Sequence, residues 1–199
     1  MILKVKNIAK SFGSNIVLKN VSFEMNSSLL YRIVGENGSG KSTLLKIIAG
    51  EWKPDNGNIL VGCQLGYCPQ KTLLLSQLTI DENLRYFAAA YEMGKAELVS
   101  RSESLMNVFN FKRYRKERIS NLSGGTQQKL NLTIALLHQP KLLILDEPYN
   151  GFDWDTYLRF WDYRNQLRKE ECAILIVTHF LTEKERFDKI YNLEEGELI

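Results

Sequence analysis

The sequence has few residues of the kinds that build disulfides and metal clusters. Among 199 residues there are three cysteines, Cys63, Cys68 and Cys172, and two histidines. Three cysteines are too few for a disulfide framework, and with only two histidines they do not form a zinc-like cluster. We therefore expect a chain that works in a reducing, cytosolic compartment.

Long hydrophobic runs are also absent. The longest, such as Leu142 to Leu145 and Ala173 to Val177, fall well short of the roughly 18 to 20 apolar residues needed to cross a bilayer. Residues 1–9 alternate apolar and charged side chains, which predicts a strand rather than a signal peptide. Any role at a membrane should therefore come through a partner.

Neither sign of charge is in large excess. Lysine and arginine total 26 against 23 acidic residues, a net charge of +3, so no nucleic-acid partner is expected. One basic run, interleaved with Phe111 and Tyr114, could contact nucleic acid or anionic lipid headgroups, although a solvated surface is the interpretation we prefer. The run consists of Lys112, Arg113, Arg115, Lys116 and Arg118.

The pattern of apolar residues predicts an α/β fold in one domain, residues 1–199. The expected early elements are strands at Ile2 to Ala9, Ile16 to Met25 and Leu29 to Val34, then a helix at Lys41 to Ala49. Continuous apolar strands at Leu142 to Leu145 and Ile174 to Val177 suit a parallel sheet covered on both faces. A helix carrying Trp154, Leu158 and Trp161 should separate these two strands.

The middle of the chain, about 75–138, should form an inserted helical lobe. Thr79 and Glu82 have the spacing of a capping box, and the helix that follows should be broken by Gly94. A second amphipathic stretch runs from Leu98 to Phe109, and a third begins after Gly125 and stops before Pro140.

A glycine-rich loop with the sequence Gly-Glu-Asn-Gly-Ser-Gly-Lys-Ser joins an apolar strand to a helix. This is the P-loop pattern in the context that the pattern requires. Its backbone N–H groups would surround a polyphosphate, Lys41 would reach the β- and γ-phosphates, and the Ser42 hydroxyl would bind Mg²⁺. The residues expected to bind ATP here are Gly35, Asn37, Gly38, Ser39, Gly40, Lys41, Ser42 and Thr43.

Two acids end the apolar strand that begins at Leu142. Carboxylates at the carboxyl edge of an open sheet stand where ligands of such folds bind. We expect Asp146 to hold Mg²⁺ and Glu147 to orient and deprotonate an attacking water.

The segment Leu122-Ser123-Gly124-Gly125-Thr126-Gln127-Gln128 opens a helix downstream of the P-loop. Here the chain resembles the ABC ATPase family, and the resemblance covers essentially all 199 residues. It implies a P-loop NTPase of ABC type with a mixed sheet core, a small antiparallel β-lobe and the inserted helical lobe. It also implies a head-to-tail dimer, in which Ser123, Gly124 and Gly125 of one subunit close over the ATP held by the other.

Further positions follow from the same resemblance. Phe12 should stack on adenine, although a core phenylalanine is the alternative. Gln70 should contact Mg²⁺ or the attacking water, Asp153 should communicate across the dimer, and His179 should contact the γ-phosphate. Thr126 and Lys129 depart from the glutamine and arginine more usual in the family, and the short passage from Gly57 to Tyr67 implies a trimmed β-lobe.

The function implied by the resemblance is that of an ATP-hydrolysing motor of a transporter. Its partners would be a second ATPase subunit, identical or different, and a transmembrane permease on a separate chain. Stand-alone exporter subunits are the most similar group, which places the chain in the cytoplasm at the inner face of the membrane. An ATPase of an assembly process such as iron–sulfur cluster biogenesis is the alternative. A repair ATPase is disfavoured, because only 105 residues (146 minus 41) separate Lys41 from Asp146.

Overall fold

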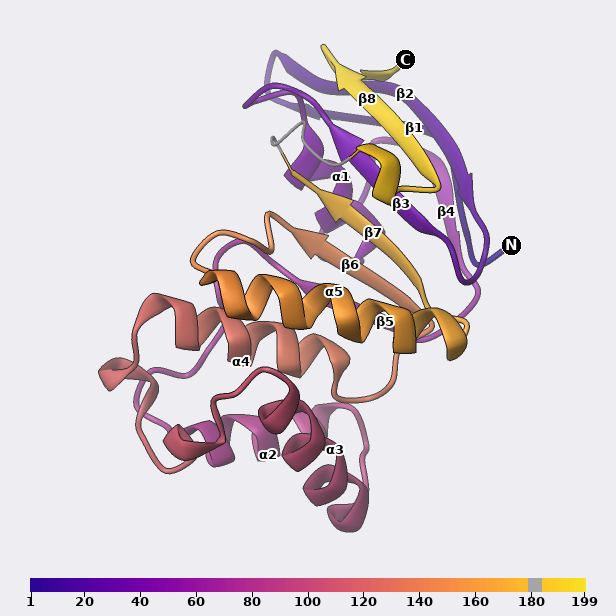
Figure 1. Ribbon diagram of the computed structural model, residues 1–199. Coiled ribbons are helices and arrows are strands. Elements are labelled where there is room, and N and C mark those ends of the chain that lie inside the picture. Colours follow the sequence, from indigo (N-terminus) through magenta and orange to yellow (C-terminus); the bar gives the residue numbers. More distant parts are fainter. Residues whose placement is uncertain (179–183) are drawn as a thin grey trace. The chain divides into compact units, whose positions relative to one another are not determined.

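The computed structural model describes residues 1–178 and 184–199 (Figure 1). The chain divides into two compact units, which we call the sheet unit and the helical unit. The sheet unit comprises Met1–Tyr67, Lys141–Glu147 and Leu167–Ile199, and the helical unit comprises Cys68–Pro140 and Pro148–Gln166.

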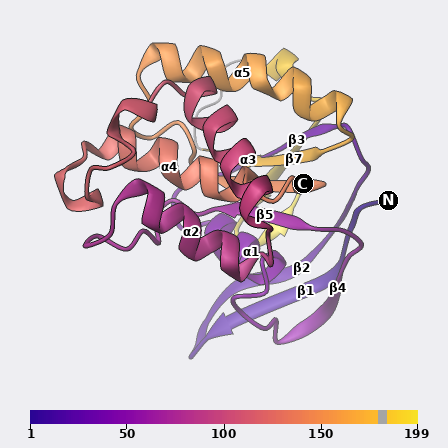
Figure 2. The same ribbon diagram turned by 90° about the horizontal axis from the view of Figure 1, so that it is seen from below.

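An antiparallel sheet in the order β2-β1-β4 forms the first part of the sheet unit. Figure 2 shows its strands side by side: β1 (Leu3–Phe12), β2 (Asn15–Met25) and β4 (Asn56–Val61). Leu3 faces Met25 and Phe12 faces Asn15 across the β1–β2 hairpin. Both expected strands are confirmed, and β1 continues to Phe12 because the hairpin keeps it paired.

The second sheet carries the buried core of the same unit. Within the described residues its order is β5-β6-β7-β3-β8-β9. Every residue is buried in β3 (Leu30–Val34), β6 (Leu142–Asp146) and β7 (Ala173–Val177), which are parallel to one another. The edge strands are β5 (Leu65–Cys68) and β9 (Glu197–Leu198), and β8 (Lys189–Glu194) lies between β3 and β9. Uninterrupted apolar sequence thus predicts buried parallel strands correctly.

Helix α1 (Lys41–Ile48) follows β3 and packs Leu44 and Leu45 into this core. Because β3, β6 and β7 run in the same direction, their carboxyl ends meet at one edge of the sheet. Residues 35–41 after β3 and residues 146–147 at the end of β6 therefore belong to that edge.

The helical unit contains α2 (Ile80–Ala90), α3 (Lys95–Val108), α4 (Gly124–Leu136) and most of α5 (Trp154–Lys169). Short 3₁₀ turns lie at Lys112–Tyr114 and Ile119–Asn121 in this unit, and a further one at Lys184–Arg186 in the sheet unit. The expected capping box is present, since Thr79 accepts from the Glu82 N–H and Glu82 accepts from the Thr79 N–H. The expected break at Gly94 is wrong in detail: α2 ends at Ala90, and Gly94 is the N-cap of α3.

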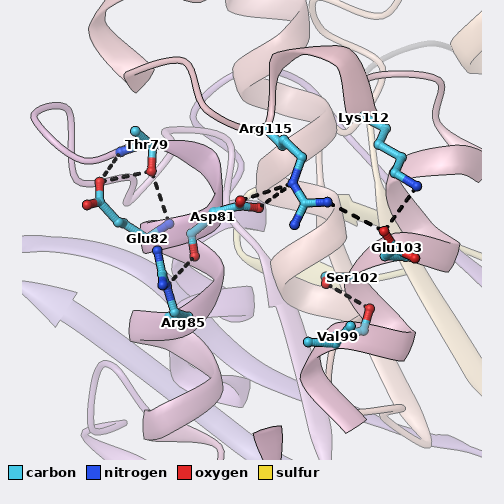
Figure 3. A network of polar contacts seen from close by, with 9 residues as sticks. All are labelled: Thr79, Asp81, Glu82, Arg85, Val99, Ser102, Glu103, Lys112 and Arg115. Carbon is cyan, nitrogen blue, oxygen red and sulfur yellow. Dashed lines mark hydrogen bonds and ion pairs between the residues drawn. The ribbon is translucent and has the colours of Figure 1, made fainter. Parts of the chain in front are cut away.

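The basic run of residues 112–118 is partly built into the helical unit. Figure 3 shows Arg115 between Asp81 of α2 and Glu103 of α3, at 3.0 and 3.4 Å, with Lys112 also 3.0 Å from Glu103. Arg113, Lys116 and Arg118 are exposed. The preferred interpretation of a solvated surface therefore describes three of the five basic residues, whereas Arg115 ties α2 to α3 and Lys112 pairs with α3.

Each helix in the described part of the chain is too short or too polar to span a membrane.

Candidate active site

The loop between β3 and α1 is shaped by glycines and ends at a helix N-terminus. Gly40 is the N-cap of α1, with φ 101°, a conformation that strongly favours glycine. A Cβ on Gly40 would lie 2.9 Å from the Val17 carbonyl oxygen, so the neighbouring backbone also leaves no room. The unpaired N–H groups of the first turn of α1 make this end of the helix attractive to an anion.

Lys41 lies beneath this loop and is buried, with 7% of its surface exposed. Its Nζ donates to the carbonyl oxygens of Gly35 and Glu36, both at 2.7 Å. Burial lowers the pKa of Lys41, while the nearby Glu147 and Asp146 oppose that change. The ammonium therefore belongs to one buried cluster with both acids at the end of β6, and it keeps a further N–H for a phosphate oxygen.

Asp146 is buried at the carboxyl end of β6, with 3% of its surface exposed. Burial raises the pKa of Asp146, and a hydrogen bond from the Ser42 side chain opposes that rise. Among the described residues, its Oδ1 has no hydrogen-bond partner. A buried carboxylate oxygen without a donor, next to a serine hydroxyl, is a donor set that suits Mg²⁺, which prefers oxygen ligands shared with phosphates and water.

Glu147 follows directly and has an unusual backbone conformation. Its φ is 48°, in the left-handed region that non-glycine residues rarely adopt. Its N–H donates to the Val177 carbonyl at 2.9 Å, and 7% of its surface is exposed. Such strain at a buried carboxylate is typical of functional sites, because the fold must hold the residue there.

Phe12 lies at the end of β1, on the same sheet unit as the loop and the acids. It is 46% exposed, so the alternative of a core phenylalanine is not what the structure shows. Trp52, which sequence reasoning missed, contacts it edge-on with ring centroids 5.2 Å apart. No local motif marks Trp52, because only the fold brings the segment after α1 to the end of β1.

Ser123 and its two glycines open helix α4 in the helical unit. The Ser123 hydroxyl caps the helix by accepting from the Thr126 N–H at 3.3 Å. A Cβ on Gly125 would lie 2.6 Å from the carbonyl oxygen of Gly151, so this glycine permits close contact with the loop before α5. Asp153 of that loop is 3.4 Å from Lys129, the position where arginine is more usual.

Gln70 is exposed, in a loop whose first residues are held by α4. The buried Asn131 amide donates to the Pro69 carbonyl at 2.9 Å and to the Cys68 sulfur at 3.2 Å. Gln128, also buried, lies 3.4 Å from the Asn131 amide. Sequence reasoning missed both amides, since polar residues inside a helix give no indication of their distant partners.

The two units thus carry different sets of the expected residues. Residues 35–43, Phe12, Asp146 and Glu147 lie in the sheet unit, whereas Gln70, Ser123, Gly124, Gly125 and Asp153 lie in the helical unit. His179 lies outside the described residues.

Comparison with known families decides the identity. The family model described as "ABC transporter" matches residues 18–150, more than half of the chain. The chain belongs to the ABC transporter family. It is an ABC ATPase domain, and both the resemblance noted in the sequence and the expected fold class are confirmed.

Several curated ABC proteins are similar over nearly the whole chain. ABC transporter G family member 20 of Dictyostelium discoideum is 31% identical over 99% of this chain, which spans 29% of that protein. The linearmycin resistance ATP-binding protein LnrL of Bacillus subtilis is 30% identical, with 99% of this chain and 68% of that protein covered. The zinc import ATP-binding protein ZnuC of Buchnera aphidicola is 35% identical, with 90% and 75% covered.

Solved ABC ATPase structures superimpose closely on the chain. The structure of an ATP-binding subunit of an ABC transporter has a TM-score of 0.93 at 30% identity, covering 100% of this chain and 88% of that one. A dimeric ATP-binding cassette in a post-hydrolysis state, bound to ADP and Pi, has a TM-score of 0.89 at 26% identity, with 98% and 96% covered.

Proposed function

We propose that this ABC ATPase is the ATP-hydrolysing motor of an exporter. It acts as a head-to-tail dimer, in the cytoplasm at the inner face of the membrane, beside transmembrane subunits on separate chains. The observation that carries the chemical part is the buried cluster of Lys41, Asp146 and Glu147 beside a glycine-rich loop at the start of α1. A polyphosphate is the ligand that such a loop and lysine would bind.

The phosphate end of ATP would be held by residues 35–43. Loop N–H groups and the N-terminus of α1 would face the phosphate oxygens, and the buried Lys41 would supply a positive charge near them. Ser42 and Asp146 would hold Mg²⁺, with Gln70 as a further contact, and the ion would neutralise phosphate charge. Asp146 suits this role because its Oδ1 has no donor among the described residues.

Glu147 would act on the water that attacks the γ-phosphate. Its carboxylate accepts the proton as the water oxygen bonds to phosphorus in line with the departing ADP oxygen, which yields ADP and phosphate. Ser123, Gly124 and Gly125 of the second copy would donate hydrogen bonds to the γ-phosphate, with His179 as another contact. Lys41 and these donors stabilise charge that develops in the transition state.

Closure of the dimer around ATP would drive the transmembrane partner. ATP shifts the equilibrium towards the closed dimer only as far as it binds that state more tightly than the open one. The names of a linearmycin resistance relative and a zinc import relative point to opposite directions of transport. We propose export, because the stretch from Leu78 to Leu84 resembles that of exporter subunits.

Replacement of Glu147 with glutamine should lower turnover by at least about 100-fold, because the amide cannot accept the proton. ATP binding should persist, since residues 35–43 are unchanged. Phosphate release and equilibrium binding of ATP check these two results. Hydrolysis at the wild-type rate would contradict the role of Glu147.

Recovery of partners from the chain's own host tests the transport role. Tagged Glu147→Gln protein is incubated with Mg-ATP and with detergent-solubilised membranes or cytosol, and Lys41→Ala serves as the control that should not bind ATP. Recovery of a multi-helix membrane protein with Glu147→Gln supports the transporter motor, and a known import permease would exclude export. Recovery of soluble assembly proteins instead would contradict transport and leave the ATPase chemistry intact.

A further inference from the structure

Two exposed aromatic rings meet at the end of β1. Phe12 is 46% exposed and Trp52 is 36% exposed, and their ring planes are inclined at 68° with the centroids 5.2 Å apart. This is an edge-to-face pair, the geometry that aromatic quadrupoles favour. An exposed phenylalanine is otherwise free to change rotamer, and the contact with Trp52 restricts that freedom for Phe12.

Trp52 is attached to the end of the phosphate-binding helix. Its backbone N–H donates to the Lys46 carbonyl at 3.3 Å, and the Lys46 ammonium lies 4.5 Å from the centroid of the indole ring. Lys46 belongs to the last turn of α1, the helix that begins with Lys41. A cation over the indole face and a backbone hydrogen bond therefore hold Trp52 on the helix whose other end would bind phosphate.

The segment that follows α1 and contains Trp52 also contacts β1, the strand that carries Phe12. Asp55 accepts from the Ser11 N–H and from Lys10 Nζ, both at 2.7 Å, and its own N–H donates to the Ala9 carbonyl at 2.9 Å. Segment 46–55 thus links α1 to the end of β1 through contacts with residues 9–12. Asp55 holds the backbone of Ala9 and Ser11, just before Phe12, and the Phe12 ring is contacted by Trp52 and by the Lys10 ammonium.

We infer that Trp52 is a positioning residue for adenine binding, holding the Phe12 ring in the plane on which the base stacks. The inference rests on the proposed function, ATP binding by this chain, and on the adenine-stacking role that the family resemblance implies for Phe12. Ordering an exposed side chain on binding costs affinity, and a ring that is already held in place avoids most of that cost. Loss of Trp52 should therefore weaken the base-dependent part of ATP binding and leave the phosphate contacts unchanged.

Steady-state hydrolysis by Trp52→Leu tests this role. The KM for ATP should rise by about three- to tenfold, as expected for loss of one aromatic pair, while kcat stays within about twofold. Inorganic tripolyphosphate, which has no base, should inhibit wild type and Trp52→Leu with the same constant. Trp52→Phe keeps an aromatic edge and should restore most of the wild-type KM.

Tyr86→Leu is the matched control. Tyr86 is 56% exposed and forms an edge-to-face pair with Phe87, 5.3 Å between centroids, on α2. Its loss should leave the KM for ATP unchanged. An unchanged KM in Trp52→Leu, or an equal loss of ATP and tripolyphosphate binding, would overturn the inference. A wild-type chain that does not hydrolyse ATP would instead refute the proposed function.

A second measurement keeps Trp52 in place and tests the inference if the Trp52→Leu protein does not fold. A variant with Trp154→Phe and Trp161→Phe keeps Trp52 as its one tryptophan. ATP should change the fluorescence of Trp52, because the base would stack on the ring that Trp52 contacts, and tripolyphosphate should not. Equal responses to both compounds, or no response to saturating ATP, would overturn the inference.

Discussion

At the scale of single residues, Asp146 combines a functional position with an electrostatic cost. It is 3% exposed, and burial raises its pKa from the ordinary value of 3.8. Buried charges destabilise a fold unless they are paired, and Ser42 provides only partial compensation. The same desolvation favours binding of a cation by Asp146, so the residue lowers the stability of the nucleotide-free chain and favours binding of Mg²⁺.

Asp146→Asn should stabilise the nucleotide-free chain at neutral pH and abolish Mg-ATP hydrolysis. A raised folded-state pKa means that the stability linked to the carboxyl is present below pH 3.8 and is lost as the pH rises through the folded pKa. The melting temperature should therefore exceed that of wild type by roughly 2 to 4 °C near neutral pH, which corresponds to about 1 kcal/mol in a chain of this size.

Thermal melts across the pH range check this prediction. The difference between Asp146→Asn and wild type should shrink as the pH falls through the folded pKa and be smallest well below pH 3.8, where the wild-type carboxyl is protonated in both states. A variant that melts below wild type at neutral pH, or a difference that does not change with pH, would contradict the argument.

Local motifs made part of the site predictable from the sequence. The glycine-rich loop, Asp146 and Glu147 each follow a strand within a few residues, so their place at one sheet edge follows from strand direction alone. Trp52 and Asn131 were missed because their partners, Phe12 and Pro69, are 40 and 62 positions away (52 minus 12 and 131 minus 69). Contacts over such separations depend on the fold and leave no local pattern.

At the scale of elements, α4 begins with the segment Ser123, Gly124 and Gly125 and also anchors the loop of Gln70. Gly125 contacts residue 151 at its first turn, and Asn131 holds Pro69 two turns later. From Leu130 to Leu136 every residue of the helix is buried. Polar residues such as Asn131 therefore lie inside the protein, where the sequence gives no indication of their partners. Likewise, the basic run gave no indication that Arg115 pairs with Asp81, 34 positions earlier.

Two neighbouring glycines of α4 should respond differently to alanine. At Gly124 an added Cβ meets nothing within 4 Å, whereas at Gly125 it meets the Gly151 carbonyl oxygen at 2.6 Å. Gly125→Ala should cost about 1 to 3 kcal/mol of unfolding free energy, as overpacking does. Gly124→Ala should be neutral or stabilising by up to about 1 kcal/mol, because alanine favours the helix.

Urea unfolding of both variants, followed by circular dichroism, measures these free energies. Gly124→Ala is the matched control for the loss of a glycine in the same helical turn. Equal unfolding free energies for the two variants would contradict the close approach of Gly125 to the loop before α5.

At the scale of the whole molecule, the chain presents two complementary sets of residues on separate units. The sheet unit carries the loop, Lys41, Asp146 and Glu147, and the helical unit carries Ser123, Gly124 and Gly125. The order of elements and the parallel core were predictable from the sequence, because each strand buried on both faces is a continuous apolar run. In the proposed dimer, a second copy supplies the Ser123, Gly124 and Gly125 that complete each ATP site.

Light scattering of the Glu147→Gln chain with and without Mg-ATP shows whether ATP joins two copies of the chain. We expect a species of 23.0 kDa without nucleotide and of twice that mass with Mg-ATP, since bound ATP would join two copies and would not be hydrolysed. Lys41→Ala, which should not hold the phosphates, should stay at 23.0 kDa under both conditions. A Glu147→Gln chain that binds ATP yet remains at 23.0 kDa would contradict a site shared between two copies.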